Sequence, residues 1–250
     1  MNILKEENMK KGFTLAEVLI TIGIVGVVSA MTIPSLINYY KAKELEVRFK
    51  KADAILSQAL LKTANEYGYD SISSFNIPGR KVTDENLAEL KGQVVELNKI
   101  WLKQFTNVEP LRFQDKVHYY YQKACHNLTG EIFGMYRTCW FSFGQPYQLP
   151  DGLLVSELQA QYGGVNHPGL IMFFFDTNGP AQGPNRWGHD LFLYYSDIDY
   201  ATFCNPTAKI SSNNFGCYHY AHKNINPAGK NKPYWDILFK PSSYWQNANK

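Results

Sequence analysis

The fold at the start of this chain is predicted from residues 10–33, KKGFTLAEVLITIGIVGVVSAMTI. Glu17 is the sole charge among the 21 residues from Phe13 to Ile33. At 1.5 Å per residue a helix of that length reaches about 31 Å, the thickness of the hydrocarbon core of a bilayer. A charge near the centre of such a helix costs about 2.5 to 3.5 kcal/mol on insertion scales. The stretch therefore predicts a transmembrane helix in which Glu17 has a function.

The same residues resemble the N-terminus of type IV pilin-like proteins, including the pseudopilins of type II secretion systems. Those chains begin with a short basic leader, then Gly, Phe and Thr-Leu-x-Glu before an apolar helix, as residues 10–17 do here. The resemblance implies that a prepilin peptidase cleaves between Gly12 and Phe13 and N-methylates Phe13. It also implies that Glu17 pairs with the terminal amine of a neighbouring subunit, because a paired buried charge is tolerated where a lone one is not. Pro34 stands where many members carry a helix-kinking proline.

The resemblance further implies a leader at 1–12, an N-terminal helix at 13–68 with its transmembrane part at 13–33, and an extracytoplasmic head at 69–250. The implied function is a structural subunit, a pseudopilin or minor pilin, of a type II secretion or type IV pilus filament. Its partners would be the prepilin peptidase, other pilin or pseudopilin subunits and an inner-membrane assembly platform. It would cross the cytoplasmic (inner) membrane once, with the head outside the cytoplasm, and reach a periplasmic or cell-surface filament on assembly. A start at Met1 or Met9, and a role in secretion, adhesion or DNA uptake, stay open.

Two other interpretations explain an apolar N-terminal segment. A secretory signal peptide would be cleaved after Ala30, since Val28-Ser29-Ala30 is a small-residue site, but an acid four residues into the apolar run is foreign to such a segment. A signal anchor predicts the same topology without cleavage. The lysines and arginine that flank the span on both sides give little bias in orientation.

Composition excludes several classes of function. The net charge of +3 over 250 residues indicates no dedicated nucleic-acid surface. The histidines are scattered, and neither a nucleophile elbow nor a phosphate-cradling loop is present, so the sequence predicts no enzyme and no catalytic site. Two alternative functions remain. One is a membrane-tethered protein that binds glycan or peptide through aromatic residues, and the other is an extracytoplasmic hydrolase. About 180 to 220 residues outside the membrane are enough for one domain with a core.

Four cysteines follow the span: Cys125, Cys139, Cys204 and Cys217. In an oxidising compartment they would form disulfides, and four cysteines allow three pairings. We favour Cys125 with Cys139 and Cys204 with Cys217, since each pair closes a short loop. A metal site within residues 217–222, which hold one cysteine and two histidines, is the weaker alternative because the spacing matches no common zinc pattern.

The pattern of apolar residues predicts an α+β fold, pilin-like, with a long N-terminal helix whose amphipathic second half packs on a head with an antiparallel sheet. Its apolar stripe is Leu45, Phe49, Ala52, Leu56, Leu60, Thr63 and Tyr67, and Gly68 ends it. A coiled coil is the alternative role for this stripe, although it is short. A second helix is expected at 84–105, capped by Thr83, with Leu87, Leu90, Val94, Leu97, Trp101 and Phe105 on one face. Strands are expected at 169–176, 190–195 and 233–240.

Residues 176–190, DTNGPAQGPNRWGHD, form the most distinctive stretch of the head. Many calcium loops begin with oxygen-bearing residues at alternate positions, followed by a glycine. Ca²⁺ binds six to eight oxygens, and the glycine allows the backbone to turn tightly around it. Asp176, Asn178 and Asp190 are therefore candidate calcium ligands, although no acid stands at the fifth or glutamate at the twelfth position of an EF-hand. The competing interpretation is a turn in which Asp176 and Asn178 bond nearby backbone amides.

Overall fold

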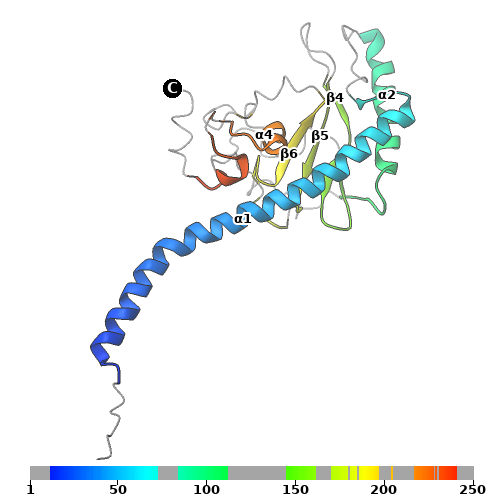
Figure 1. Cartoon of the computed structure of the whole chain (residues 1–250). Helices are drawn as coiled ribbons and strands as arrows, with labels where there is room; N and C mark the ends of the chain where they lie inside the picture. Colours follow the sequence, from blue (N-terminus) through cyan, green and yellow to red (C-terminus); the bar gives the residue numbers. More distant parts are fainter. Residues whose placement is uncertain are drawn as a thin grey trace, which may run out of the picture. The chain divides into compact units, whose positions relative to one another are not determined.

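The structure is a computed structural model that describes residues 12–72, 84–111, 145–161, 170–179, 181–184, 186–196, 204, 217–227, 229 and 231–240. The chain divides into two compact units, residues 1–41 and 42–250. A long N-terminal helix is followed by an antiparallel sheet, so the predicted α+β, pilin-like layout is confirmed (Figure 1).

Helix α1 runs from Leu15 to Tyr67 without interruption. Pro34 lies inside it and, lacking an N–H, leaves the carbonyl of Ala30 without its usual partner one turn on. The helix ends where the sequence predicts, because Gly68 adopts a φ of +92° that favours glycine. The Tyr69 N–H donates to the Ala64 carbonyl at 2.9 Å and the Gly68 N–H to the Asn65 carbonyl at 3.1 Å, which is the pattern of a Schellman cap.

The second half of α1 buries the predicted stripe in the core of the 42–250 unit. The buried residues of α1 recur at three- and four-residue intervals: Ala42, Leu45, Glu46, Phe49, Ala52, Leu56, Ala59, Leu60, Thr63 and Ala64. Tyr67 is half-buried. Phe49 is the largest of these side chains, and its ring lies 4.6 Å from Phe192 and 5.2 Å from Trp235, centroid to centroid. The stripe therefore belongs to the head's own core and not to a coiled coil.

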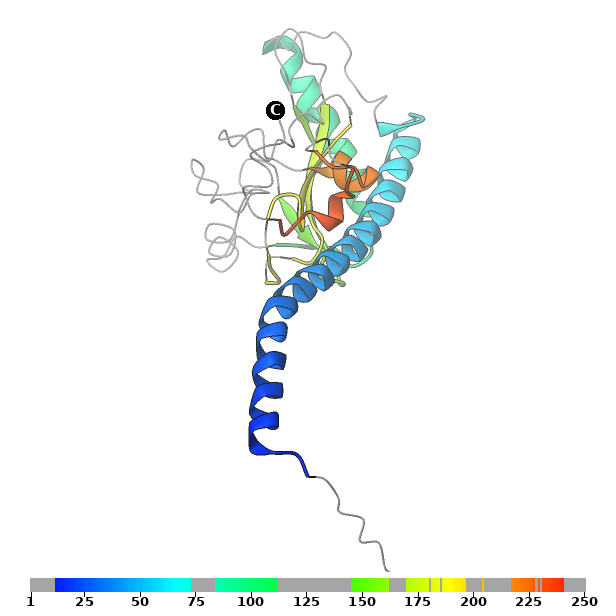
Figure 2. The same ribbon diagram turned by 60° about the vertical axis from the view of Figure 1, so that its left-hand side comes forward.

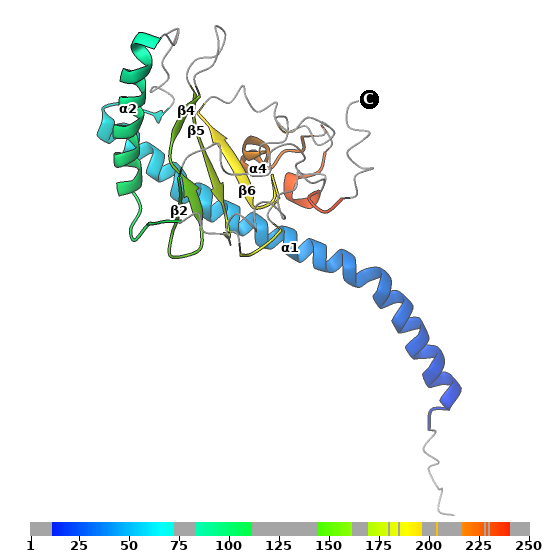
Figure 3. The same ribbon diagram turned by 180° about the vertical axis from the view of Figure 1, so that it is seen from behind.

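Helix α2 spans Asp84–Lys103, two residues shorter than predicted. Leu97 and Trp101 are fully buried and Phe105, just beyond the helix, is buried as well, so the predicted apolar face is confirmed at these positions. The proposed cap, Thr83, lies outside the described residues. Figure 3 shows α2 beside the last turns of α1, where Gln104 Nε2 donates to Glu66 Oε2 at 3.1 Å.

The sheet is antiparallel throughout and contains β1 (Glu109–Pro110), β2 (Pro146–Gln148), β3 (Leu154–Ser156), β4 (Gln159–Gln161), β5 (Leu170–Asp176) and β6 (Leu191–Tyr195). β2 lies between β1 and β3, and β5 pairs with β3 and β4 on one edge and with β6 on the other. The predicted strands at 169–176 and 190–195 correspond to β5 and β6.

A β-bulge separates β3 from β4. Val155 pairs with Phe175 and Gln159 with Met172, so four steps on one strand match three on β5. The freed backbone groups find partners in α2: Trp101 Nε1 donates to the Ser156 carbonyl at 3.1 Å.

Asn98 of α2 also bonds backbone groups of the bulge. Its Nδ2 donates to the Leu158 carbonyl at 2.8 Å and its Oδ1 accepts the Leu158 N–H at 2.6 Å. The hydroxyl of Ser156 accepts the Phe174 N–H at 2.9 Å. Side chains from a distant helix thus satisfy the backbone that the bulge would otherwise leave unpaired.

The sheet is covered on both faces. Ile171, Phe173 and Phe175 of β5 pack on the side of α1, α2 and α4 (Tyr218–Lys223), as Figure 2 shows for α1 and α4. Met172 and Phe174 face the opposite cluster, which includes Trp187. A strand that is buried on both faces has a continuous apolar sequence. This explains why Met172, Phe173, Phe174 and Phe175 are all apolar.

The predicted strand at 233–240 is wrong. Tyr234–Asp236 form a short 3-10 helix, η4, followed by turns. Tyr234, Trp235, Ile237 and Leu238 are buried, whereas Asp236 between the two pairs is exposed. Such a spacing of about three residues suits a 3-10 turn, and strict alternation would be needed for a half-buried strand.

Candidate functional site

The predicted cleavage site lies outside the helix. Gly12, Phe13 and Thr14 are not helical, and α1 begins at Leu15. The side chain of Phe13 is 88% exposed. The bond between Gly12 and Phe13 therefore lies in exposed, irregular backbone, the kind of segment that proteases cleave most readily.

Thr14 and Glu17 form a reciprocal capping box at the start of α1. Glu17 Oε2 accepts the Thr14 N–H and the Thr14 hydroxyl, each at 2.8 Å, while the Glu17 N–H donates to Thr14 Oγ1 at 3.3 Å. The arrangement satisfies backbone donors that a helix start leaves unpaired. Thr14 is a site residue beyond those predicted above, although Thr-x-x-Glu before an apolar run is the recognised signal for this motif.

Glu17 therefore also has a local role, as the acidic residue of this capping box. Within the described residues both hydrogen bonds to its carboxylate go to Oε2. Oε1 is left for a second donor, and a carboxylate accepts several bonds at once. Thr14 thus orients the carboxylate through Oε2 and leaves Oε1 available for a further bond.

The 176–190 loop brings the predicted calcium ligands to one end of the β5–β6 ladder. Asp176 is the last residue of β5 and pairs with Leu191, the residue after Asp190. Asp176 and Asp190 are fully buried and Asn178 is nearly so. The structure therefore places the three residues near one another at this end of the ladder, where the Thr177 N–H donates to the Asp190 carbonyl at 2.9 Å.

The hydrogen bonds of this segment match the second interpretation of the sequence, a turn in which side chains bond nearby backbone amides. Asp176 Oδ1 accepts the Asn178 N–H at 3.0 Å and the Gly179 N–H at 2.9 Å. Asp190 Oδ1 accepts the Arg186 N–H at 2.7 Å. Carboxylates that cap turns in this way stabilise a loop without a cation.

The residues fit a hard cation only in part. Among the described buried side chains, Asn178 Oδ1 and Thr177 Oγ1 have no hydrogen-bond partner, and such oxygens accept either a water or a metal ion. No group of three or more His, Cys, Asp or Glu side chains that could hold a metal occurs in the described part of the chain. Calcium in this loop stays a prediction of the sequence.

A calcium titration separates the two interpretations. Calcium bound to the folded chain alone would raise its melting temperature, and Asn178→Ala would abolish that rise by removing the unpartnered oxygen. Gln182→Ala, an exposed position of the same loop, would keep it. The measurement is thermal unfolding of the detergent-solubilised chain in excess calcium and in chelator. Equal melting temperatures in the two conditions would contradict a calcium site and leave the hydrogen-bonded turn.

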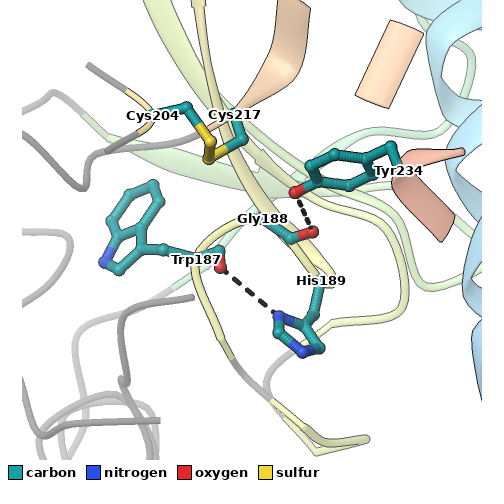
Figure 4. Close-up of a disulfide and its surroundings, with 6 residues drawn as sticks. All are labelled: Trp187, Gly188, His189, Cys204, Cys217 and Tyr234. Carbon is teal, nitrogen blue, oxygen red and sulfur yellow. Dashed lines mark hydrogen bonds between the residues drawn. A yellow bond between two sulfur atoms is a disulfide. The ribbon is translucent and has the colours of Figure 1, made fainter. Parts of the chain in front are cut away.

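His189 ties this loop to the segment around η4. Its ring is fully buried, with Nδ1 3.4 Å from the Trp187 carbonyl and Nε2 3.2 Å from the Leu238 carbonyl (Figure 4 shows the first contact). The Tyr234 hydroxyl donates to the Gly188 carbonyl at 2.6 Å. Burial, with a smaller contribution from the charge of Arg186, lowers the pKa of His189 to about 4.

The low pKa of His189 predicts acid sensitivity of the head. Between pH 6.5 and about 4 the unfolded chain takes up the proton and the folded chain does not, so stability falls as pH falls through this window. The loss reaches at most about 3 kcal/mol. Denaturant unfolding at pH 7 and pH 4.5 measures it, and His189→Gln should flatten the dependence. Retention of the full dependence in His189→Gln would contradict this role, and His222→Gln, which keeps His189, serves as the control.

Cys204 and Cys217 form the predicted disulfide, with Cα atoms 4.9 Å apart (Figure 4). Cys125 and Cys139, and with them the other predicted pairing, lie outside the described residues. The alternative metal site at 217–222 does not fit the structure, because the sulfur of Cys217 is bonded to Cys204 and carries no free thiolate.

Helix α4 contains the two histidines of that alternative, and one of them contacts α1. His222 Nδ1 lies 2.9 Å from Asp53 Oδ2, and the Tyr218 hydroxyl donates to Asp53 Oδ1 at 2.5 Å. Burial and the nearby charge of Asp53 raise the pKa of Tyr218 well above its usual value, so it stays a donor. These contacts attach α4, which follows the disulfide-bonded Cys217, to the buried half of α1.

Comparison with known proteins finds a family match for the N-terminal segment. Residues 8–33 match the family described as the prokaryotic N-terminal methylation motif. No curated protein and no solved structure matches the chain. The matched segment covers Gly12, Phe13, Thr14 and Glu17, and α1 is long and apolar enough to cross a membrane. The chain therefore carries the N-terminal methylation motif that is the signature of type IV pilins and pseudopilins.

Proposed function

We propose that this chain is a structural subunit, a pseudopilin or minor pilin, of a type II secretion or type IV pilus filament. The observation that carries the proposal is the N-terminal arrangement: an exposed non-helical Gly12-Phe13 bond, the Thr14–Glu17 cap, and then an apolar helix exposed over its first half. The methylation motif over residues 8–33 supports the same function.

Processing would give Glu17 its partner. A prepilin peptidase cleaves between Gly12 and Phe13, and the freed, methylated amine of one subunit approaches Glu17 Oε1 of its neighbour. Each charge then offsets the cost of burying the other, while Thr14 keeps Oε2 occupied within its own chain. The role of Thr14 is to position the carboxylate.

The head would lie outside the cytoplasm, with the chain anchored in the inner membrane by the apolar half of α1 until an assembly platform extracts it. The Cys204–Cys217 disulfide supports this placement, because such bonds persist in oxidising compartments. The well-packed core around the second half of α1 supports a structural role, since it gives the filament subunit a rigid head.

Identification of the N-terminal residue in cells tests this function. The proposal expects the mature chain to begin at N-methylated Phe13 when the prepilin peptidase is present, and at Met1 or Met9 when it is deleted. A chain that keeps its leader in both strains would support a membrane-tethered binding protein instead. A chain that begins after Ala30 would support a signal peptide and a secreted head.

A further inference from the structure

We propose that Tyr39, Tyr40 and Lys41 form an anchor in the lipid headgroup region that fixes the depth of α1 in the bilayer. This inference rests on the membrane-anchored part of the proposed function. It extends the membrane-embedded segment to Ile37, beyond the end at Ile33 that hydropathy alone suggests.

Apolar side chains continue past Ile33 on α1. Leu36 is 53% and Ile37 46% exposed, as the preceding apolar residues of the helix are. Ser35 and Asn38 are the polar residues among them. The apolar surface thus ends just before the two tyrosines.

The length of this longer segment matches a bilayer. Leu15 to Ile37 are 23 residues of one helix, which at 1.5 Å each reach about 34 Å. A tilt of about 20°, the average for such helices, reduces the thickness crossed to about 32 Å, close to that of the hydrocarbon core. The next turn of the helix then lies among the headgroups.

The residues in that turn have the chemistry of the membrane interface. Tyr39 is 53% and Tyr40 64% exposed, and their rings meet edge to face with centroids 5.8 Å apart. Tyrosine gathers at this level of membranes because its ring is apolar and its hydroxyl is polar. The two rings therefore form one aromatic patch on the surface of the helix.

Lys41 completes the anchor. It is exposed and directly follows the tyrosines, and a lysine at the end of a span extends its ammonium toward lipid phosphates while its stem covers apolar surface. Residue 42 begins the unit that contains the head.

Cysteine accessibility tests the anchor in the full chain. Leu36→Cys, Ile37→Cys and Lys41→Cys are made singly, and open membrane sheets are treated with a membrane-impermeant maleimide, with the unsubstituted chain as the background control. We expect the cysteine at 41 to react at least about ten-fold faster than those at 36 and 37, because the hydrocarbon core excludes the reagent. Equal rates at 37 and 41 would overturn the inference and place the end of the span at Ile33.

Variants of the tyrosines test their contribution. In the Ile37→Cys background, replacing both by alanine should raise the labelling rate, whereas replacing both by tryptophan should leave it low, since tryptophan is also an interfacial residue. No effect of the alanine pair would show that the tyrosines do not anchor the helix and would favour a contact with another protein. Carbonate extraction tests the proposed function separately: release of the chain would overturn membrane anchoring itself.

Discussion

Replacing Glu17 by leucine is expected to abolish incorporation of the chain into filaments while leaving it in the membrane. Leucine removes the carboxylate that would receive the neighbour's amine, which leaves a buried amine without a partner. Breaking one half of a buried pair costs about 3 to 5 kcal/mol, or at least about a 100-fold loss of assembled subunit. The sheared filament fraction measures assembly, and carbonate extraction measures membrane insertion.

Three further substitutions distinguish the charge of Glu17 from its part in the capping box. Glu17→Gln keeps a side chain that completes the box but removes the charge, so it should also fail to assemble. Thr14→Ser keeps the hydroxyl of the cap and should assemble, whereas Thr14→Val removes it and should assemble less well. Normal assembly of Glu17→Gln would contradict the ion pair and leave Glu17 only as a helix cap.

Replacing Phe49 by alanine is expected to destabilise the head by about 3 to 5 kcal/mol, the usual cost of deleting a buried aromatic side chain. Phe49 is 1% exposed and lies at the centre of an aromatic cluster with Phe175, Phe192, Tyr218 and Trp235. Its ring therefore connects α1 to β5, β6, α4 and η4. Denaturant unfolding of the detergent-solubilised chain, followed by near-ultraviolet circular dichroism, measures the loss.

Val47 provides the matched control for Phe49 on the same helix. Its side chain is 67% exposed, so Val47→Ala should change the free energy of unfolding by no more than about 0.5 kcal/mol. Similar effects of the two substitutions would contradict the assignment of the buried face of α1.

Much of the fold could be predicted because its signals are local. The stripe from Leu45 to Thr63 repeats at helical spacing, and the run from Met172 to Phe175 identifies β5 by its composition. Gly68 ends α1 for a reason that involves only its neighbours. The pairing of Cys204 with Cys217, favoured because it closes a short loop, is confirmed.

The remaining features depend on distant residues. β2, β3 and β4 are three residues each, too short to show a period. The bulge between β3 and β4 is stable because Asn98 and Trp101 of α2 satisfy its backbone, and nothing in residues 154–161 indicates that contact. The segment at 233–240 contains aromatic residues typical of strands, but tertiary packing selects a 3-10 turn.

The candidate site shows the same division. Gly12, Phe13 and Glu17 were predicted from a contiguous motif. The role of Thr14 is local as well, because its hydroxyl and the Glu17 carboxylate three residues later bond each other at the start of the helix. In the 176–190 loop the residue types were equally typical of a cation site and of a turn, and the choice depends on which backbone amides the carboxylates of Asp176 and Asp190 reach.

The structure of the assembled filament around Glu17 tests the ion pair directly. We expect the Glu17 carboxylate to lie within about 4 Å of the Phe13 nitrogen of a neighbouring subunit, with Thr14 of the same chain on the other oxygen. A filament in which the neighbour's amine lies elsewhere, and Glu17 contacts only its own Thr14, would contradict it.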